Sequence, residues 1–233
     1  MSSLPPESAA DLLPWERRRA DPVTAFVDTV KLFVTRPDEA WRITPERGGL
    51  ESPLLFGLII SFLGAAMSFV YRWIFGSAWM RMFPAAAFRR WGGAPWWAMR
   101  RPGGCAIIVW PFVAAFTILI GLFVCAAILH LFVLIVGAAR GSASGFEGSF
   151  RVVSYSAVSS LAQVIPLFGG LIAFVWWIVL AVKGIVRLHR TTTGRALAAV
   201  LVPIALVMGL VVLCAIVVFG LILATHRSGS YSL

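Results

Sequence analysis

Acidic residues are almost absent beyond residue 51, since only Glu147 follows Glu51. A soluble domain contains about 25% charged residues, whereas this chain of 233 residues is 13% charged and 60% hydrophobic. A water-soluble shell cannot be built from that composition. Four runs carry no charge of either sign: 52–71, 102–139, 152–182 and 196–226. Each run has the about 20 residues that a helix needs to cross a bilayer, which predicts a multi-pass membrane protein.

Patterns of catalytic and metal-binding residues are missing as well. The three cysteines are dispersed, and no two have the spacing of metal ligands. The chain lacks a phosphate-binding glycine loop with lysine, a His-Glu-x-x-His motif and a Gly-x-Ser-x-Gly motif. No carboxylate lies in an uncharged run, which excludes a carboxylate proton relay there. We therefore expect no enzyme activity, no cofactor and no metal.

The net charge of +10 is unevenly distributed. Residues 1–51 hold seven basic and nine acidic side chains, whereas 52–233 hold thirteen basic and one acidic. Basic residues beside membrane runs indicate topology and contact anionic headgroups, so we expect lipid rather than nucleic acid as a partner. Arginine outnumbers lysine eighteen to two, which suggests a GC-rich bacterial genome and hence the bacterial cytoplasmic (inner) membrane.

The N-terminal region divides into two expected parts. Residues 1–20 show the mixed charge and proline content of a disordered tail and no cleavable signal. In the segment 21–51, Asp21 as N-cap and Pro22 at the first helical position predict a helix start. Apolar residues then recur at helical spacing until Pro37: Val23, Phe26, Val27, Val30, Phe33 and Val34. This amphipathic helix is too short to span, and it either lies on the membrane surface or packs on the membrane domain.

The membrane domain is expected at 52–226, followed by a tail at 227–233. Pro166 and the pair Gly169-Gly170 interrupt the third uncharged run, which becomes either one kinked span or a tight hairpin of two short ones. With the N-terminus in the cytoplasm, five spans place thirteen basic residues inside and seven outside, whereas four spans place ten on each side. The positive-inside rule favours five. We predict an all-α polytopic bundle with spans at about 53–73, 106–137, 152–166, 169–186 and 196–224, the third and fourth forming a short hairpin.

Polar and small residues inside these spans are candidates for helix contacts. Ser156 and Ser160 have the four-residue spacing that permits close helix packing. His130 is the one clear ionisable residue within a span, and we expect it to hydrogen-bond a neighbouring helix rather than act on protons or a metal. The candidate polar or packing positions are His130, Tyr155, Ser156, Ser160, Gln163, Pro166, Gly169 and Gly170.

The loop 74–101 combines tryptophan with arginine, which together favour the headgroup zone of a bilayer. We expect it to rest in the interface, although its position on the outside is an alternative. Its candidate lipid contacts are Trp79, Arg89, Arg90, Trp91, Trp96 and Trp97.

Several short elements in order resemble the YIP family, named for Ypt/Rab-interacting proteins. Residues 141–156 read GSASGFEGSFRVVSYS, and 165–170 read IPLFGG. Arg36-Pro37 upstream and Trp176-Trp177, Lys183-Gly184 and Leu188-His189 downstream extend the resemblance over roughly 25–225. It implies five spans, a cytoplasmic N-terminus, no known cofactor and roles in trafficking and membrane shaping, whereas the 74–101 insertion departs from the short family loop.

We thus expect a non-enzymatic, membrane-organising or trafficking-like scaffold that acts through protein and lipid contacts. Its protein partner would be another membrane protein or a second copy. The alternative is a transporter or channel subunit for a small solute or lipid, in which His130, Tyr155, Ser156 and Gln163 line a polar path.

Overall fold

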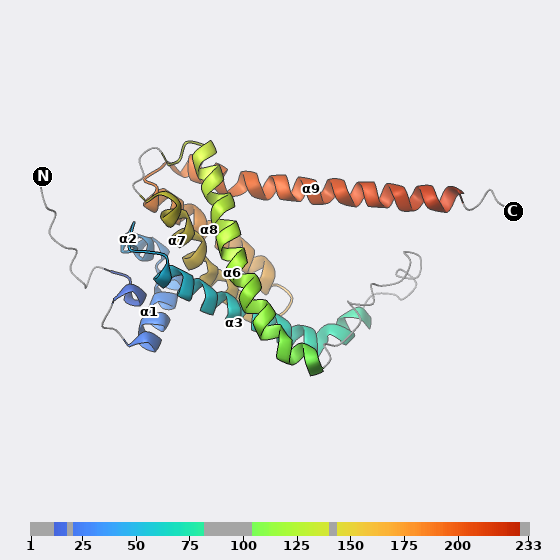
Figure 1. Ribbon diagram of the computed structural model, residues 1–233, viewed down its shortest axis with the longest axis horizontal. Coiled ribbons are helices and arrows are strands. Elements are labelled where there is room, and N and C mark those ends of the chain that lie inside the picture. Colours follow the sequence, from blue (N-terminus) through green and yellow to red (C-terminus); the bar gives the residue numbers. More distant parts are fainter. Residues whose placement is uncertain (1–11, 18–20, 82–103, 140–143, 229–233) are drawn as a thin grey trace, which may run out of the picture.

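The computed structural model describes residues 12–17, 21–81, 104–139 and 144–228, and the regular elements in these ranges are all helices (Figure 1). The all-α prediction is confirmed for this part of the chain. The elements are η2 (Pro14–Glu16), α1 (Pro22–Thr35), α2 (Pro37–Arg42), α3 (Glu51–Arg81), α6 (Gly104–Ile135), α7 (Gly145–Ser156), η3 (Ala157–Val164), α8 (Gly169–Leu188) and α9 (Thr193–Ser228).

Four helical segments among the described residues are long and apolar enough to cross a membrane. They are Glu51–Tyr71, Ile107–Ile135, Gly169–Leu188 and Thr193–Gly220. The chain is therefore a multi-pass membrane protein. The span expected at 152–166 differs from the prediction, because α7 ends at Ser156 and the chain continues in the narrower 3-10 winding of η3.

One end of the bundle is covered by a layer formed by residues 12–17 and 21–47, here called the N-terminal layer (Figure 1). The indole of Trp15 donates to Ser52 O at 2.8 Å, at the start of α3. Asp38 contacts Lys183 near the end of α8, and Ser144 before α7 donates to Leu188 O at 3.0 Å. The starts of α3, α7 and α9 and the ends of α6 and α8 therefore meet at this end, and we call it the capped end.

α3 and the α7–η3 segment run side by side in the same direction. Gly57 faces Ser154, Gly64 faces Ser160, and Ser68 hydrogen-bonds Gln163. The eleven residues from Gly57 to Ser68 rise about 17 Å at 1.5 Å each. The nine from Ser154 to Gln163 also rise about 17 Å, since most of them are in the 3-10 form at about 2.0 Å each. Because of the 3-10 winding, nine residue steps of the α7–η3 segment cover the same length as eleven steps of α3, so the paired residues stay opposite each other.

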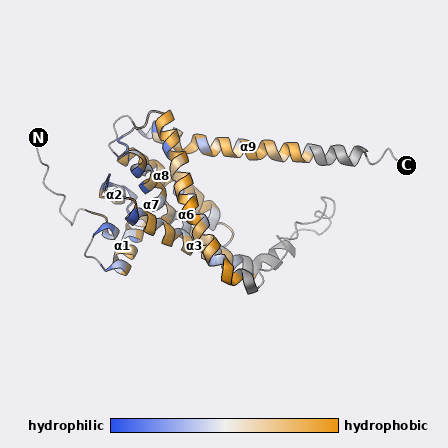
Figure 2. Ribbon diagram, viewed as in Figure 1, coloured by the Kyte–Doolittle hydropathy of each residue, from blue (hydrophilic) through white to orange (hydrophobic). Residues whose placement is uncertain are grey.

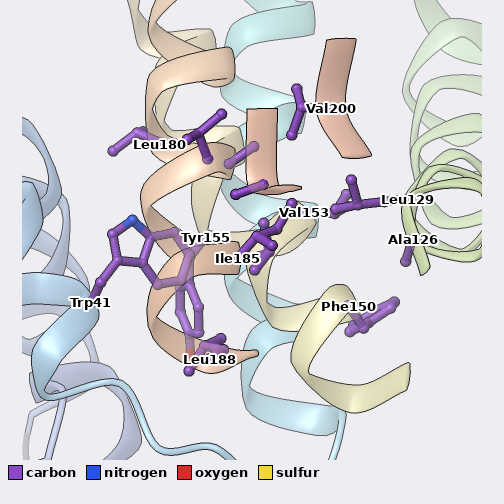
Figure 3. Packing of buried hydrophobic residues seen from close by; sticks show 14 of the residues in the cluster. Trp41, Ala126, Leu129, Phe150, Val153, Tyr155, Leu180, Ile185, Leu188 and Val200 are labelled. Atoms are coloured by element: carbon purple, nitrogen blue, oxygen red, sulfur yellow. The ribbon is translucent and has the colours of Figure 1, made fainter. Parts of the chain in front are cut away.

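Aromatic rings join the N-terminal layer to the bundle core. Phe33 stacks on Tyr155 at a centroid distance of 5.5 Å and meets Trp41 edge-on at 5.0 Å. Trp41 lies beside Tyr155 in Figure 3 and packs against Gly184 of α8, where a side chain would not fit: a Cβ would lie 2.8 Å from the indole. This cluster fixes α1 and α2 on α7 and α8.

α1 begins as predicted, with the Asp21 carboxylate accepting from Thr24 N at 2.8 Å. Its apolar face, however, is split between two environments. Phe33 is buried and Phe26 and Val30 pack on the core. Three members of the predicted face are instead exposed: Val23, Val27 and Val34. The expected disorder of 1–20 is corrected for 12–17, because Leu13 is buried and Trp15 N donates to Thr29 Oγ1 at 3.0 Å.

α9 leaves the bundle after its first turns (Figure 1). Up to residue 220, where burial is described, its buried residues are Ala196, Ala199 and Val200, and the residues from 205 to 219 are exposed all round. Figure 2 shows apolar residues along most of α6 and α9 and hydrophilic residues gathered around α1, α2 and the start of α7. An exposed apolar surface of this kind suits contact with lipid rather than water.

Candidate functional site

Arg151 is the central charged residue of the capped end. It lies in α7, and its side chain is fully buried. Nη1 donates to the Glu16 carboxylate, Nε to Glu147 Oε1 at 3.2 Å and Nη2 to Gly49 O at 3.0 Å. The sequence alone did not indicate that this arginine is buried. The structure shows instead that it ties together η2, the turn before α3 and α7.

The groups around Arg151 complete an enclosed polar site. The Tyr155 hydroxyl, also buried, donates to Glu16, so this predicted site residue contacts the N-terminal layer rather than a path through the bundle. Gly49 N donates to Glu147 Oε1 at 2.8 Å. Gly48 and Gly49 have φ of +152° and +90°, and a Cβ on Gly48 would lie 3.0 Å from Arg151 Nη2. The turn therefore needs glycine to wrap closely around the guanidinium.

A second set of ion pairs lies at the rim of the N-terminal layer and is more exposed. Lys183 Nζ contacts the two Asp38 oxygens at 2.6 and 2.7 Å. Glu46 Oε1 accepts from Arg190 Nη2 at 2.8 Å and from its Nε at 3.0 Å, and it lies 3.7 Å from Arg187 Nη1. One carboxylate oxygen thus holds two arginines that flank the end of α8.

His130 takes part in a hydrogen-bonded chain across three elements. Its Nδ1 lies 3.0 Å from Ser149 Oγ in α7, and the same oxygen lies 3.1 Å from Nε2 of His189, just past α8. A serine hydroxyl has one proton, so at most one of these contacts uses it, and a ring N–H supplies the other. Burial and the proximity of His130 lower the pKa of His189 to about 4, against an opposing effect of Glu46. His189 is therefore neutral at pH 7.

The remaining predicted positions lie along the α7–η3 segment and at the turn that leads into α8. Ser160 Oγ donates to Ile60 O at 3.0 Å, and Gln163 bonds Ser68. The buried Ser156 hydroxyl has no hydrogen-bond partner among the described residues. At the turn that contains Pro166, a Cβ on Gly169 would lie 2.4 Å from Ala162 O, whereas the corresponding position at Gly170 is open. Of the candidate interface residues, Trp79 lies within α3. The others fall outside the described residues: Arg89, Arg90, Trp91, Trp96 and Trp97.

Several residues of the capped end were missed as site residues by sequence reasoning. Glu16 lies in a stretch whose composition indicates disorder, and its contact with Arg151 spans 135 residues. Glu147 and Arg151 are four residues apart on α7, a spacing that places them on one helix face, and they pair at 3.2 Å. Ser149 and His189 fall in stretches that carry the family resemblance, but their contact with each other had no signal in the sequence, and neither had that of Glu46. Within the described ranges, no group of three or more His, Cys, Asp or Glu is placed to hold a metal ion.

Comparison with known proteins gives a family assignment over most of the chain. The family model described as "Yip1 domain" matches residues 30–216, which include α2 to α8, the last turns of α1 and most of α9. No curated protein and no solved structure matches the chain.

Proposed function

Because the chain belongs to the Yip1 domain family, we propose that this multi-pass membrane protein is a non-enzymatic scaffold that organises the membrane through lipid and protein contacts. The observation that carries the proposal is the division of the molecule. Apolar helices face outward over most of their length, whereas the strongest described polar contacts tie the N-terminal layer onto the capped end. The proposed setting is a bacterial cytoplasmic membrane.

Five crossings are proposed, with the capped end in the cytoplasm. The α7–η3 segment has twelve α-helical and eight 3-10 residues, a rise of about 34 Å, which matches a hydrocarbon core of about 30 Å. It starts at the capped end, beside Leu188. At its other end, the Val164 carbonyl accepts from Tyr71, the last residue of the first candidate span. This pairing supports an α7–η3 crossing parallel to α3, which returns through α8.

α1 is proposed to lie in the headgroup zone of the cytoplasmic leaflet, beside the start of α3. Its exposed stripe of Val23, Val27 and Val34 has no covering partner among the described residues. The contact of Phe26 with Phe56, at 5.2 Å, places α1 against the first turns of α3. An apolar helical stripe at that level would insert between headgroups and expand one leaflet relative to the other.

Reconstitution into liposomes tests this proposal. At a high protein-to-lipid ratio, the wild type should reduce vesicle diameter, measured by electron cryomicroscopy. Val23→Ser, Val27→Ser and Val34→Ser combined should abolish the effect without unfolding the protein, because these side chains are already exposed. Asp28→Asn, on another exposed face of α1, is the matched control and should act as the wild type. Vesicles of unchanged size with the wild type would contradict the proposal.

A transporter or channel subunit is the second candidate, favoured by the chain His130–Ser149–His189 inside the capped end. In that case His130→Ala should abolish a solute flux across proteoliposomes while the vesicle shape stays as in the wild type. A flux unaffected by His130→Ala would leave this chain of hydrogen bonds as a structural contact.

A further inference from the structure

The half-buried carboxylate of Glu46 is held by two arginines at the rim of the N-terminal layer. It comes from the N-terminal layer, and a single oxygen receives Arg190 Nη2 and Nε at 2.8 and 3.0 Å, with Arg187 Nη1 at 3.7 Å. Arg187 Nη2 also donates to Arg42 O at 3.3 Å. We call the guanidinium groups of Arg187 and Arg190, which converge on this one oxygen, the arginine fork. Guanidinium groups bind phosphate oxygens as well as carboxylates.

This arginine fork lies where headgroups would be found. Arg187 is in the last turn of α8, a candidate membrane span that ends at Leu188, and Arg190 lies two residues beyond it. The cations sit beside the negative end of the helix dipole, which favours their charged form and their position there. With the capped end in the cytoplasm, as the proposed function requires, this level of the bilayer contains the anionic headgroups that attract basic residues.

The pair with Glu46 is suited to exchange. The side chains of Arg187 and Arg190 are 43% and 63% exposed and that of Glu46 is 21% exposed, whereas Arg151 and Glu16 are 0% and 8% exposed. Exposed pairs are weak and screened by salt, but removal of one partner from a buried pair leaves an uncompensated charge. The rim can therefore open while the pair of Arg151 with Glu16, and Trp41 on Gly184, hold the layer in place.

We propose that Arg187 and Arg190 form a binding site for the phosphodiester of an anionic phospholipid, and that Glu46 is its built-in competitor. The inference rests on the proposed membrane orientation and extends it to a specific lipid contact. When the headgroup enters, its phosphate oxygens accept the hydrogen bonds of the two guanidinium groups. Glu46 moves out to solvent, and the segment after α2 separates from the end of α8.

The test is binding of phosphatidylglycerol to the delipidated full-length protein in mild detergent, measured by native mass spectrometry. Zwitterionic phosphatidylcholine and soluble glycerol phosphate are the comparison ligands. Wild type should prefer phosphatidylglycerol over both, and the preference should fall with added salt. Glu46→Gln should raise the affinity for phosphatidylglycerol by up to about five-fold, the ratio that corresponds to ~1 kcal/mol, and should not change that for phosphatidylcholine.

Two further variants locate the effect. The double change Arg187→Gln and Arg190→Gln should abolish the preference for phosphatidylglycerol. Asp38→Asn is the matched control, since it breaks the other exposed rim pair and leaves the arginine fork intact. It should change the affinity less than two-fold.

Three results would each overturn the inference: an unchanged affinity in Glu46→Gln, an equal rise in Asp38→Asn, or glycerol phosphate bound as tightly as the lipid. The salt titration on the wild type provides a readout that does not depend on the folding of any variant. The vesicle-diameter measurement is independent of this site. A failed lipid preference with intact vesicle remodelling therefore removes only the inference, whereas the reverse result removes only the proposed function.

Discussion

Replacement of Glu16 by alanine should destabilise the protein far more than its place near the N-terminus suggests. Glu16 lies on a three-residue 3-10 turn, yet its carboxylate receives both the fully buried Arg151 and the buried Tyr155 hydroxyl. Without it, Arg151 retains Glu147 and Gly49 O. Removal of one partner from a buried ion pair costs about 3–5 kcal/mol. Because Glu147 still compensates part of the charge, we expect the lower end, about 3 kcal/mol.

A double-mutant cycle separates the ion pair from the packing of the turn. With Arg151→Met, the buried charge is replaced by an apolar side chain, and the combination of Glu16→Ala and Arg151→Met should cost about 1 kcal/mol or less, since apolar substitutes for buried pairs are often neutral. Glu147→Ala is the matched control. This carboxylate also contacts Arg151 but is 25% exposed, so its loss should cost about 1 kcal/mol.

The assay is denaturant-induced unfolding of the full-length protein in mild detergent, followed by tryptophan fluorescence and helical circular dichroism. The free energy of unfolding of each variant is compared with that of the wild type. A cost below about 0.5 kcal/mol for Glu16→Ala, or a cost equal to that of Glu147→Ala, would refute the reasoning that Glu16 neutralises a desolvated guanidinium.

Three other predictions concern packing and pH. Gly64→Ala should destabilise by about 1–3 kcal/mol, because its Cβ would lie 2.7 Å from Ser160 Cβ and 3.0 Å from Ser160 O, whereas Gly121→Ala, with open space, should be neutral or stabilising in the same unfolding assay. Gly184→Ala should destabilise the protein by a similar amount, because the added methyl group meets the indole of Trp41. It should also shift the tryptophan fluorescence emission. The lowered pKa of His189, about 4 against an ordinary 6.5, means that the unfolded chain binds its proton first as the pH falls. Stability from this group is thus complete above about pH 6.5 and declines towards pH 4, by at most about 3 kcal/mol, and His189→Gln should flatten that part of the curve.

Local features of the chain were predictable because they depend on neighbouring residues. Asp21 and Pro22 set the start of α1, as the hydrogen bond to Thr24 N confirms, and the uncharged runs correspond to the four long apolar helices. The family resemblance noted from short motifs agrees with the match to the Yip1 domain. These signals come from helix capping and hydropathy, which act within a few turns.

The site at the capped end could not be predicted in the same way. The burial of Arg151 depends on Glu16 and on the turn at Gly48 and Gly49, which come from distant parts of the sequence. The mean composition of residues 1–20 hid the anchoring role of Leu13 and Trp15. The 3-10 winding of η3 lies beside α3, which is distant in the sequence, so the apolar pattern of the segment alone did not indicate it.

The charged start of α7 also explains why the hydropathy pattern alone left the number of spans open. The α7–η3 segment begins with Glu147 and Arg151, both held at the capped end, and becomes apolar only beyond them. The uncharged run 152–182 therefore misses the first turns of α7 and is shorter than two full spans of about 20 residues each.

Cysteine accessibility tests the five-pass arrangement most directly. Single cysteines at Ser8, Phe168 and Ser230, each introduced separately into a cysteine-free chain, are labelled in intact cells with a membrane-impermeant maleimide. Five crossings with the capped end in the cytoplasm predict that Ser8→Cys is protected until the cells are permeabilised, whereas Phe168→Cys and Ser230→Cys react at once. Equal labelling of the Ser8 and Ser230 positions, or protection of the position at Phe168, would contradict it.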